Sequence, residues 1–123
     1  MSFYLITYPN QHKKTPSFFV LNKGNYSGSP SKKPYGNCFA VYTDSPDLFA
    51  QVHAGFLLSY FKPKLIGSCI KFIRKKDMNE VIAKCQKISI DKARKVELLE
   101  KQAEKYLQIV AALRKCIIVK LRQ

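Results

Sequence analysis

VELLEKQAEKYLQIVAALRKCI, residues 96–117, is the stretch with the strongest structural signal in this chain. Its apolar residues alternate three and four positions apart, and they are Val96, Leu99, Ala103, Tyr106, Val110, Leu113 and Ile117. Residues at this spacing lie on one narrow face of an α-helix, as in a helix that pairs in a coiled coil. The sequence therefore predicts a helix with an apolar seam, and "the seam" below means these seven residues.

The predicted helix begins near Ser89 or Asp91 and runs to the end of the chain, about 45–50 Å at 1.5 Å per residue. Its other faces carry lysine and glutamate in pairs such as Glu97–Lys101, which are typical of a solvated helix surface. Ile109, Ile118, Val119 and Leu121 are apolar residues that lie off the seam. A lone two-stranded coil would expose them, so we expect a second face packed against the helix beginning at Ser45 or against the sheet.

The rest of the chain predicts short strands and two shorter helices. Runs rich in aromatic and aliphatic residues predict strands at 3–7, 18–21, 38–42 and 69–73. A helix with Ser45 as its N-cap and Pro46 at its first position extends to about Pro63. A shorter helix runs from Asp77, its expected N-cap, to about Lys84.

These elements place the protein in the α+β class. We expect a small, mainly antiparallel sheet packed with a helix, followed by a long C-terminal coiled-coil-like helix. The chain is short enough for one structural unit, with a basic α+β body at residues 1–88 and the long amphipathic helix at 89–123.

The chain carries a large excess of positive charge. It has 22 lysines and arginines against 8 aspartates and glutamates, a net charge of +14. Such an excess attracts polyanions such as nucleic acid or anionic membranes. The alternatives are an acidic protein partner, or lysines that only keep the protein soluble.

Basic residues cluster in the predicted loops. The clusters are Lys13 with Lys14, Lys32 with Lys33, and Arg74 with Lys75 and Lys76. Lysines at strand ends can follow a phosphate backbone, and Tyr26 and Tyr35 in the loop at 22–37 could stack on bases. We predict that these seven basic residues bind duplex DNA. Alternatively, the clusters lie on different faces and form no continuous patch.

No pattern of catalytic, cofactor-binding or metal-binding residues is visible. Asp44, Asp47, Asp77 and Glu80 lie near predicted helix starts, where capping accounts for them. The glycines at 24–36 match neither a P-loop nor a dinucleotide-binding pattern. The cysteines Cys38, Cys69, Cys85 and Cys116 contain no C-x-x-C pair, so buried free thiols in a reducing compartment are expected. We expect no enzyme activity, no cofactor and no metal.

Several motifs resemble those of a family of short, uncharacterised proteins of Bacteroidales gut bacteria. The motifs are LNKG at 21–24, SGSP at 27–30, NCF at 37–39 and GSCIKFIR at 67–74, with Asp77. The order of elements from Asn37 onward is more distantly similar to one half of a type I restriction specificity subunit. That resemblance implies a DNA-reading domain followed by a long helix that pairs with other helices. No base-contacting residue is implied, and the Pro-Pro-leucine segment of those subunits is replaced here by residues 87–91.

Two functional hypotheses follow from these patterns. The first is a non-enzymatic DNA-binding module that forms a homodimer through the seam. The second is a protein-interaction adaptor or modulator whose seam docks onto another helical protein without DNA binding. The sequence shows no signal peptide and no apolar run long enough to span a membrane, so we expect a cytoplasmic protein without a membrane partner.

Overall fold

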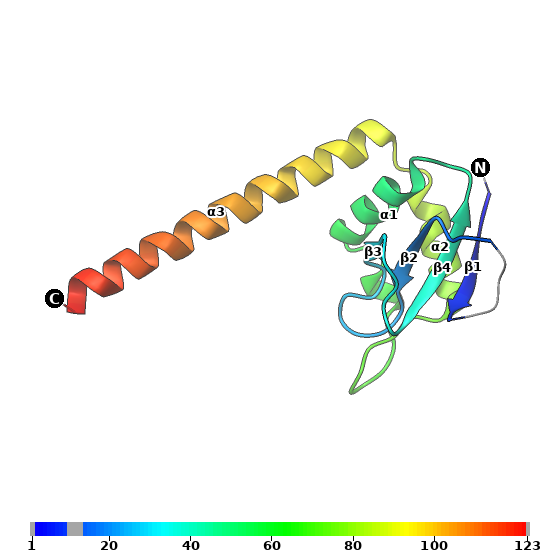
Figure 1. The fold of residues 1–123 in the computed structure, drawn as a ribbon, viewed down its shortest axis with the longest axis horizontal. Helices are drawn as coiled ribbons and strands as arrows, with labels where there is room; N and C mark the ends of the chain where they lie inside the picture. Colours follow the sequence, from blue (N-terminus) through cyan, green and yellow to red (C-terminus); the bar gives the residue numbers. More distant parts are fainter. Residues whose placement is uncertain (1, 10–13, 123) are drawn as a thin grey trace.

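The α+β prediction is confirmed by a computed structural model, which describes residues 2–9 and 14–122 (Figure 1). A small antiparallel sheet and three short helical segments form a body, from which one long helix projects. The elements are β1 (Phe3–Tyr8), β2 (Phe18–Leu21), β3 (Pro30–Ser31), β4 (Cys38–Thr43), α1 (Leu48–Leu57), η1 (Lys62–Lys64), α2 (Lys75–Cys85) and α3 (Ile90–Arg122).

The sheet has the strand order β1-β4-β2-β3, and every neighbouring pair is antiparallel. The central strand β4 pairs with both longer strands, so that Val41 lies beside Leu5 on one side and Phe18 on the other. Side chains of successive residues point to opposite faces of a strand. This alternation separates the sheet's apolar residues into two clusters, one on each face.

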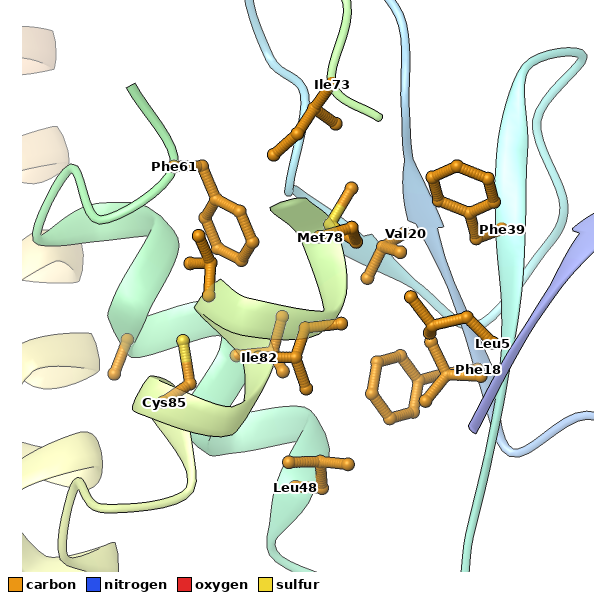
Figure 2. Close-up of a cluster of buried hydrophobic side chains, with 14 of the residues drawn as sticks. Leu5, Phe18, Val20, Phe39, Leu48, Phe61, Ile73, Met78, Ile82 and Cys85 are labelled. Carbon is orange, nitrogen blue, oxygen red and sulfur yellow. The ribbon is translucent and has the colours of Figure 1, made fainter. Parts of the chain in front are cut away.

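The larger cluster fills the space between the sheet and the helices α1 and α2 (Figure 2). Phe61, Met78 and Ile82 approach the sheet from the helical side, and all three are fully buried. Gly55 lets α1 approach α2 closely, because a Cβ atom at this position would lie 2.2 Å from the Sγ atom of Cys85. The smaller cluster lies on the opposite face, where the rings of Tyr4 and Tyr42 stack with their centroids 4.8 Å apart.

The predicted strand at 69–73 is wrong. The residues before and within it form a narrow loop, closed by two hydrogen bonds between Ile66 and Phe72 of 2.8 and 2.9 Å. The segment then joins the loop after β2 and not the sheet, since the Ile73 amide donates to the Asn22 carbonyl at 3.0 Å. Only Ile73 is buried, whereas Ile70 is 59% exposed. The outer edge of β2 pairs instead with the two-residue strand β3. A segment of two residues is too short for its sequence to predict a strand.

The starts of α1 and α2 also differ from the prediction. The residue that precedes α1 is Asp47, while Ser45 lies two residues earlier and its Oγ atom accepts a hydrogen bond from the Asp47 amide at 3.3 Å. Helix α2 begins at Lys75, and Asp77 lies in its first turn, where a carboxylate is favoured by the helix dipole. The Asp77 carboxylate accepts a hydrogen bond from Arg74 Nε at 3.1 Å.

Helix α3 begins at Ile90, as predicted, and Ser89 caps it by accepting a hydrogen bond from the Lys92 amide at 3.2 Å. The link before it is held to α1 by Gln51, whose side-chain amide donates to the carbonyls of Gln86 and Ile88. The first two turns of α3 pack on the core of the body, through Ile90, Ala93 and Val96.

The expected second packed face of α3 does not form against the body. The off-seam residues Ile109, Ile118, Val119 and Leu121 are all exposed, and Leu121 is 82% exposed. The physical reason is length, because α1 has ten residues and α3 has 33. At 1.5 Å per residue α1 spans only about 15 Å, so it can cover no more than the first turns of a helix of about 50 Å.

Candidate functional site

The most distinctive surface of the molecule is the part of the seam that projects beyond the body. Six seam residues are exposed, and we call them the free seam: Leu99, Ala103, Tyr106, Val110, Leu113 and Ile117. The seventh, Val96, is half-buried against the core. Val96 joins the two apolar sides of α3, because Ala93, three residues before it, packs on the core, and Leu99, three residues after it, begins the free seam.

Further apolar residues flank the free seam. Leu107 is 70% exposed and Ile109 is 54% exposed, and each is adjacent in sequence to a seam residue. Exposed apolar residues are ordinary when scattered singly, but a contiguous stripe of this kind marks an interaction surface. Lys101 pairs with Glu97 across one turn at 3.6 Å, which confirms that a solvated face accompanies the stripe.

The charges of α3 are divided along its length. All four of its acidic residues lie in the half nearer the body, and they are Asp91, Glu97, Glu100 and Glu104. After Glu104 every charged residue is basic, and these are Lys105, Arg114, Lys115, Lys120 and Arg122. The helix therefore has a mixed half next to the body and a purely cationic half at its tip.

The structure separates the predicted DNA-binding residues into two groups. Lys32 and Lys33 follow β3, whose Ser31 lies beside Phe19 near the start of β2, and Lys32 contacts Phe49 of α1 on the helix-covered face. Lys14 also precedes β2, but its carbonyl accepts a hydrogen bond from the Tyr42 hydroxyl at 3.5 Å, on the opposite face of the sheet. Arg74, Lys75 and Lys76 begin α2 beyond the other end of β2, because the preceding Ile73 bonds to Asn22. The two groups thus lie at opposite ends of the sheet. Lys13, the seventh predicted residue, lies outside the described residues.

Lys32 and Arg74 have partners within the body. The ammonium group of Lys32 lies 4.1 Å from the centre of the Phe49 ring, in a cation–π contact. Arg74 forms an ion pair with Asp77, whose side chain is only 10% exposed. The aromatic residues Tyr26 and Tyr35 of the loop at 22–37 are exposed, at 71% and 44%.

A pocket of about 670 Å³, which the sequence analysis missed, opens in the angle between the body and α3. Its lining comes from four separate segments: Asn25, Tyr26, Ser27, Phe56, Leu57, Ser59, Phe61, Lys62, Leu65, Lys71 and Glu100. The one local signal is Gly28, which has a φ of +97° and whose Cβ atom would lie 2.3 Å from the Phe61 ring. That contact shows how closely the loop approaches this end of α1.

The described part of the body contains two buried thiols, those of Cys38 and Cys85. Burial raises the pKa of the Cys85 thiol to about 12 and also raises that of Cys38, so both thiols stay protonated near neutral pH. Both are buried, as expected, whereas the same expectation is wrong for the exposed Cys69 and Cys116. Within residues 2–9 and 14–122, no group of three His, Cys, Asp or Glu side chains is placed to hold a metal ion.

The chain belongs to a family of proteins of unknown function, DUF6943, whose sequence profile matches residues 5–122. The resemblance to an uncharacterised family is therefore confirmed at this level. No curated protein and no solved structure matches the chain significantly, so the resemblance to restriction specificity subunits has no support from these comparisons. Over the part of the chain that the structure describes, no helix combines the length and apolar character needed to cross a membrane.

Proposed function

We propose that this protein is a non-enzymatic interaction module that associates with a second copy of itself through the free seam of α3. The observation that supports this proposal is the exposure of six regularly spaced apolar residues on the part of α3 that projects beyond the core of the body. An amphipathic helix in water gains most of its stability from packing its apolar face. A partner helix with the same spacing would supply that packing.

The side chains along the seam suit packing against another helix. Large apolar residues occupy both of its repeated positions, Val110 and Ile117 at one and Leu99 and Leu113 at the other, so each can insert between residues of a partner helix. Burying a large apolar side chain contributes about 1.5–3 kcal/mol, and association costs an estimated 4–15 kcal/mol. Each copy contributes five large side chains of the free seam. Even if each gains only half of the burial free energy, their sum can offset the cost of association.

The experiment is to measure the molar mass in solution over a concentration series, by sedimentation equilibrium or light scattering. The wild-type chain should form a dimer, and Leu113→Glu should weaken it at least about a hundredfold, because a carboxylate would be buried in the seam. Gln108→Glu is the matched control, since it adds the same group to an exposed position of the same helix off the seam. A wild-type chain that stays monomeric at high micromolar concentration would contradict the proposal.

A second candidate function is duplex DNA binding by the body, which the net charge of +14 favours. Lys32 and Lys33 are the better candidates for phosphate contacts, because the cation–π contact of Lys32 leaves its positive charge uncompensated, whereas Arg74 at the other end of the sheet is paired with a carboxylate. In a dimer, two such basic bodies would be joined by α3, as the resemblance to a restriction specificity half suggests. The alternative is that the free seam docks onto a different helical protein. In that case the isolated chain should have the solution mass of a monomer.

A further inference from the structure

We infer that two copies of α3 pair antiparallel, with Leu99 of each copy opposite Ile117 of the other. This inference rests on the proposed self-association, and it adds the orientation and the register of the pair. Three features of the structure carry it: the position of the body relative to the seam, the symmetry of the seam about Gln108, and the division of charge along α3.

The position of the body disfavours a parallel pair. The body covers α3 at its first turns, where Ala93 is only 1% exposed and Val96 packs on the core. Ala93 precedes Glu100 by seven residues, so the covered side lies on one flank of the seam. In a parallel pair the two bodies would lie at the same end of the helices and would crowd each other there. In each copy the body lies at one end of α3 and the tip of the helix at the other (Figure 1). In an antiparallel pair the two bodies would therefore lie at opposite ends, and the tip of each helix would run toward the body of the other copy.

The free seam is complementary to itself when it is reversed. With Gln108 at the centre, Leu99 meets Ile117, Ala103 meets Leu113 and Tyr106 meets Val110, and each pairing occurs twice by symmetry. The smallest seam residue thus faces a leucine, and the tyrosine faces a valine. All six residues of the free seam are used, and Val96 stays in the core of its own body.

The same register accounts for residues that flank the seam. Leu107 and Ile109 lie on opposite flanks of the seam, one residue before and one residue after Gln108. On each flank the side chain therefore packs against the same residue of the second copy across the symmetry axis, which covers both leucines and both isoleucines. Glu100 comes to lie beside Arg114 of the second copy, which is the kind of flanking pair that sets helix orientation. In a parallel pair, Ile109 would instead face Arg114, and two copies of Lys120 would meet at the next seam position.

The division of charge favours the same orientation. Antiparallel pairing places the half of α3 that contains all its acidic residues against the purely basic half of the second copy, whereas parallel pairing places the two basic halves together.

Charge exchange tests the orientation. Glu100→Arg and Arg114→Glu should each weaken the dimer about tenfold, because each reversal turns two attractive contacts into repulsive ones. The double variant should return to within about twofold of the wild-type dissociation constant, since the pair is restored with reversed sign. The matched control is the double variant Lys95→Glu with Glu100→Arg. It restores the pair that positions 95 and 100 would form in a parallel dimer, so an antiparallel dimer of this variant should remain as weak as that of Glu100→Arg alone.

The outcomes separate the two proposals. A wild-type monomer would overturn both the self-association and its geometry. A wild-type dimer in which the Glu100–Arg114 exchange fails to restore affinity would overturn only the antiparallel register. Circular dichroism of each variant should match the wild type at equal fraction dimer, which excludes loss of the helix as the cause.

Cross-linking provides an independent readout. In the antiparallel register, Gln102 of one copy lies across from Cys116 of the other. A Gln102→Cys variant in a Cys69→Ser background, treated with a short bis-maleimide, should give a dimer in which peptide mapping joins position 102 to position 116. Links that join 102 to 102 or 116 to 116 would instead show a parallel pair and overturn the inference.

Discussion

Val96 and Leu99 lie one turn apart on the same side of α3, yet Val96 packs on the core of the body and Leu99 is 56% exposed. The boundary between the body and the projecting helix falls between these two residues. The apolar residues of α3 are therefore divided, since Ala93 and Val96 fix the helix to the body and the seam residues from Leu99 onward are exposed.

Hydrogen exchange should show the same boundary. We expect the amides of residues 98–122 to exchange much faster than those of 93–97 in dilute solution, because an unpacked helix opens easily. Protection of 98–122 should rise with protein concentration as the seam becomes covered, while that of the body stays constant. Equal protection at every concentration would show that the projecting helix is stable without a partner.

Gly55→Ala should destabilise the body. Its new Cβ atom would lie 2.2 Å from Cys85 Sγ, and Gly55 is itself buried between α1 and α2. Overpacking of this kind costs about 1–3 kcal/mol of unfolding free energy, measurable by urea denaturation. Gly36→Ala is the control, because nothing lies within 4 Å of its added Cβ atom, and it should be nearly neutral.

Alkaline pH should destabilise the protein through Cys85. Its thiol has a pKa of about 12 in the folded chain because of burial, against an ordinary value of 9.0. Between these values the unfolded chain loses a proton that the folded chain keeps, so stability falls with rising pH by up to about 1.4 kcal/mol per unit. Below pH 9 both states keep the proton, and the effect vanishes.

The measurement compares urea unfolding of the wild type and Cys85→Ala from neutral pH to about pH 10. The variant is less stable throughout because it leaves a cavity, but the part of the alkaline decline due to this thiol should disappear. Cys116→Ala, which changes an exposed thiol on α3, should retain the wild-type decline. Identical pH profiles for all three chains would contradict the assignment to Cys85.

DNA binding by the body should depend more on one end of the sheet than on the other. Lys32→Glu with Lys33→Glu should lower the affinity for duplex DNA and reduce the slope of log K against log salt by roughly 0.9 for each phosphate that is no longer neutralised. Lys75→Glu with Lys76→Glu, at the opposite end, should have the smaller effect. A variant that combines all four substitutions and still binds DNA as tightly as the wild type would exclude these basic residues as the DNA-binding surface.

The sequence by itself determined α3, its seam and the α+β class. These features are local, because a three-and-four spacing can be satisfied only by a helix, and each run of aromatic and aliphatic residues in β1, β2 and β4 is a strand signal on its own. The start of α3 near Ser89 is local too, since the capping hydroxyl acts within three residues.

Only the tertiary structure decided which surfaces are free. The residues at 69–73 form no strand because their backbone groups find partners in Ile66 and in the loop after β2, contacts that no local pattern encodes. The basic residues separate because Ser31 pairs with Phe19 near the start of β2, which places Lys32 and Lys33 there, whereas Ile73 bonds to Asn22 beyond its end and places Arg74 there. The seam divides after Val96 because α1 is too short to cover more of α3, and that depends on how distant segments pack and not on the helix itself.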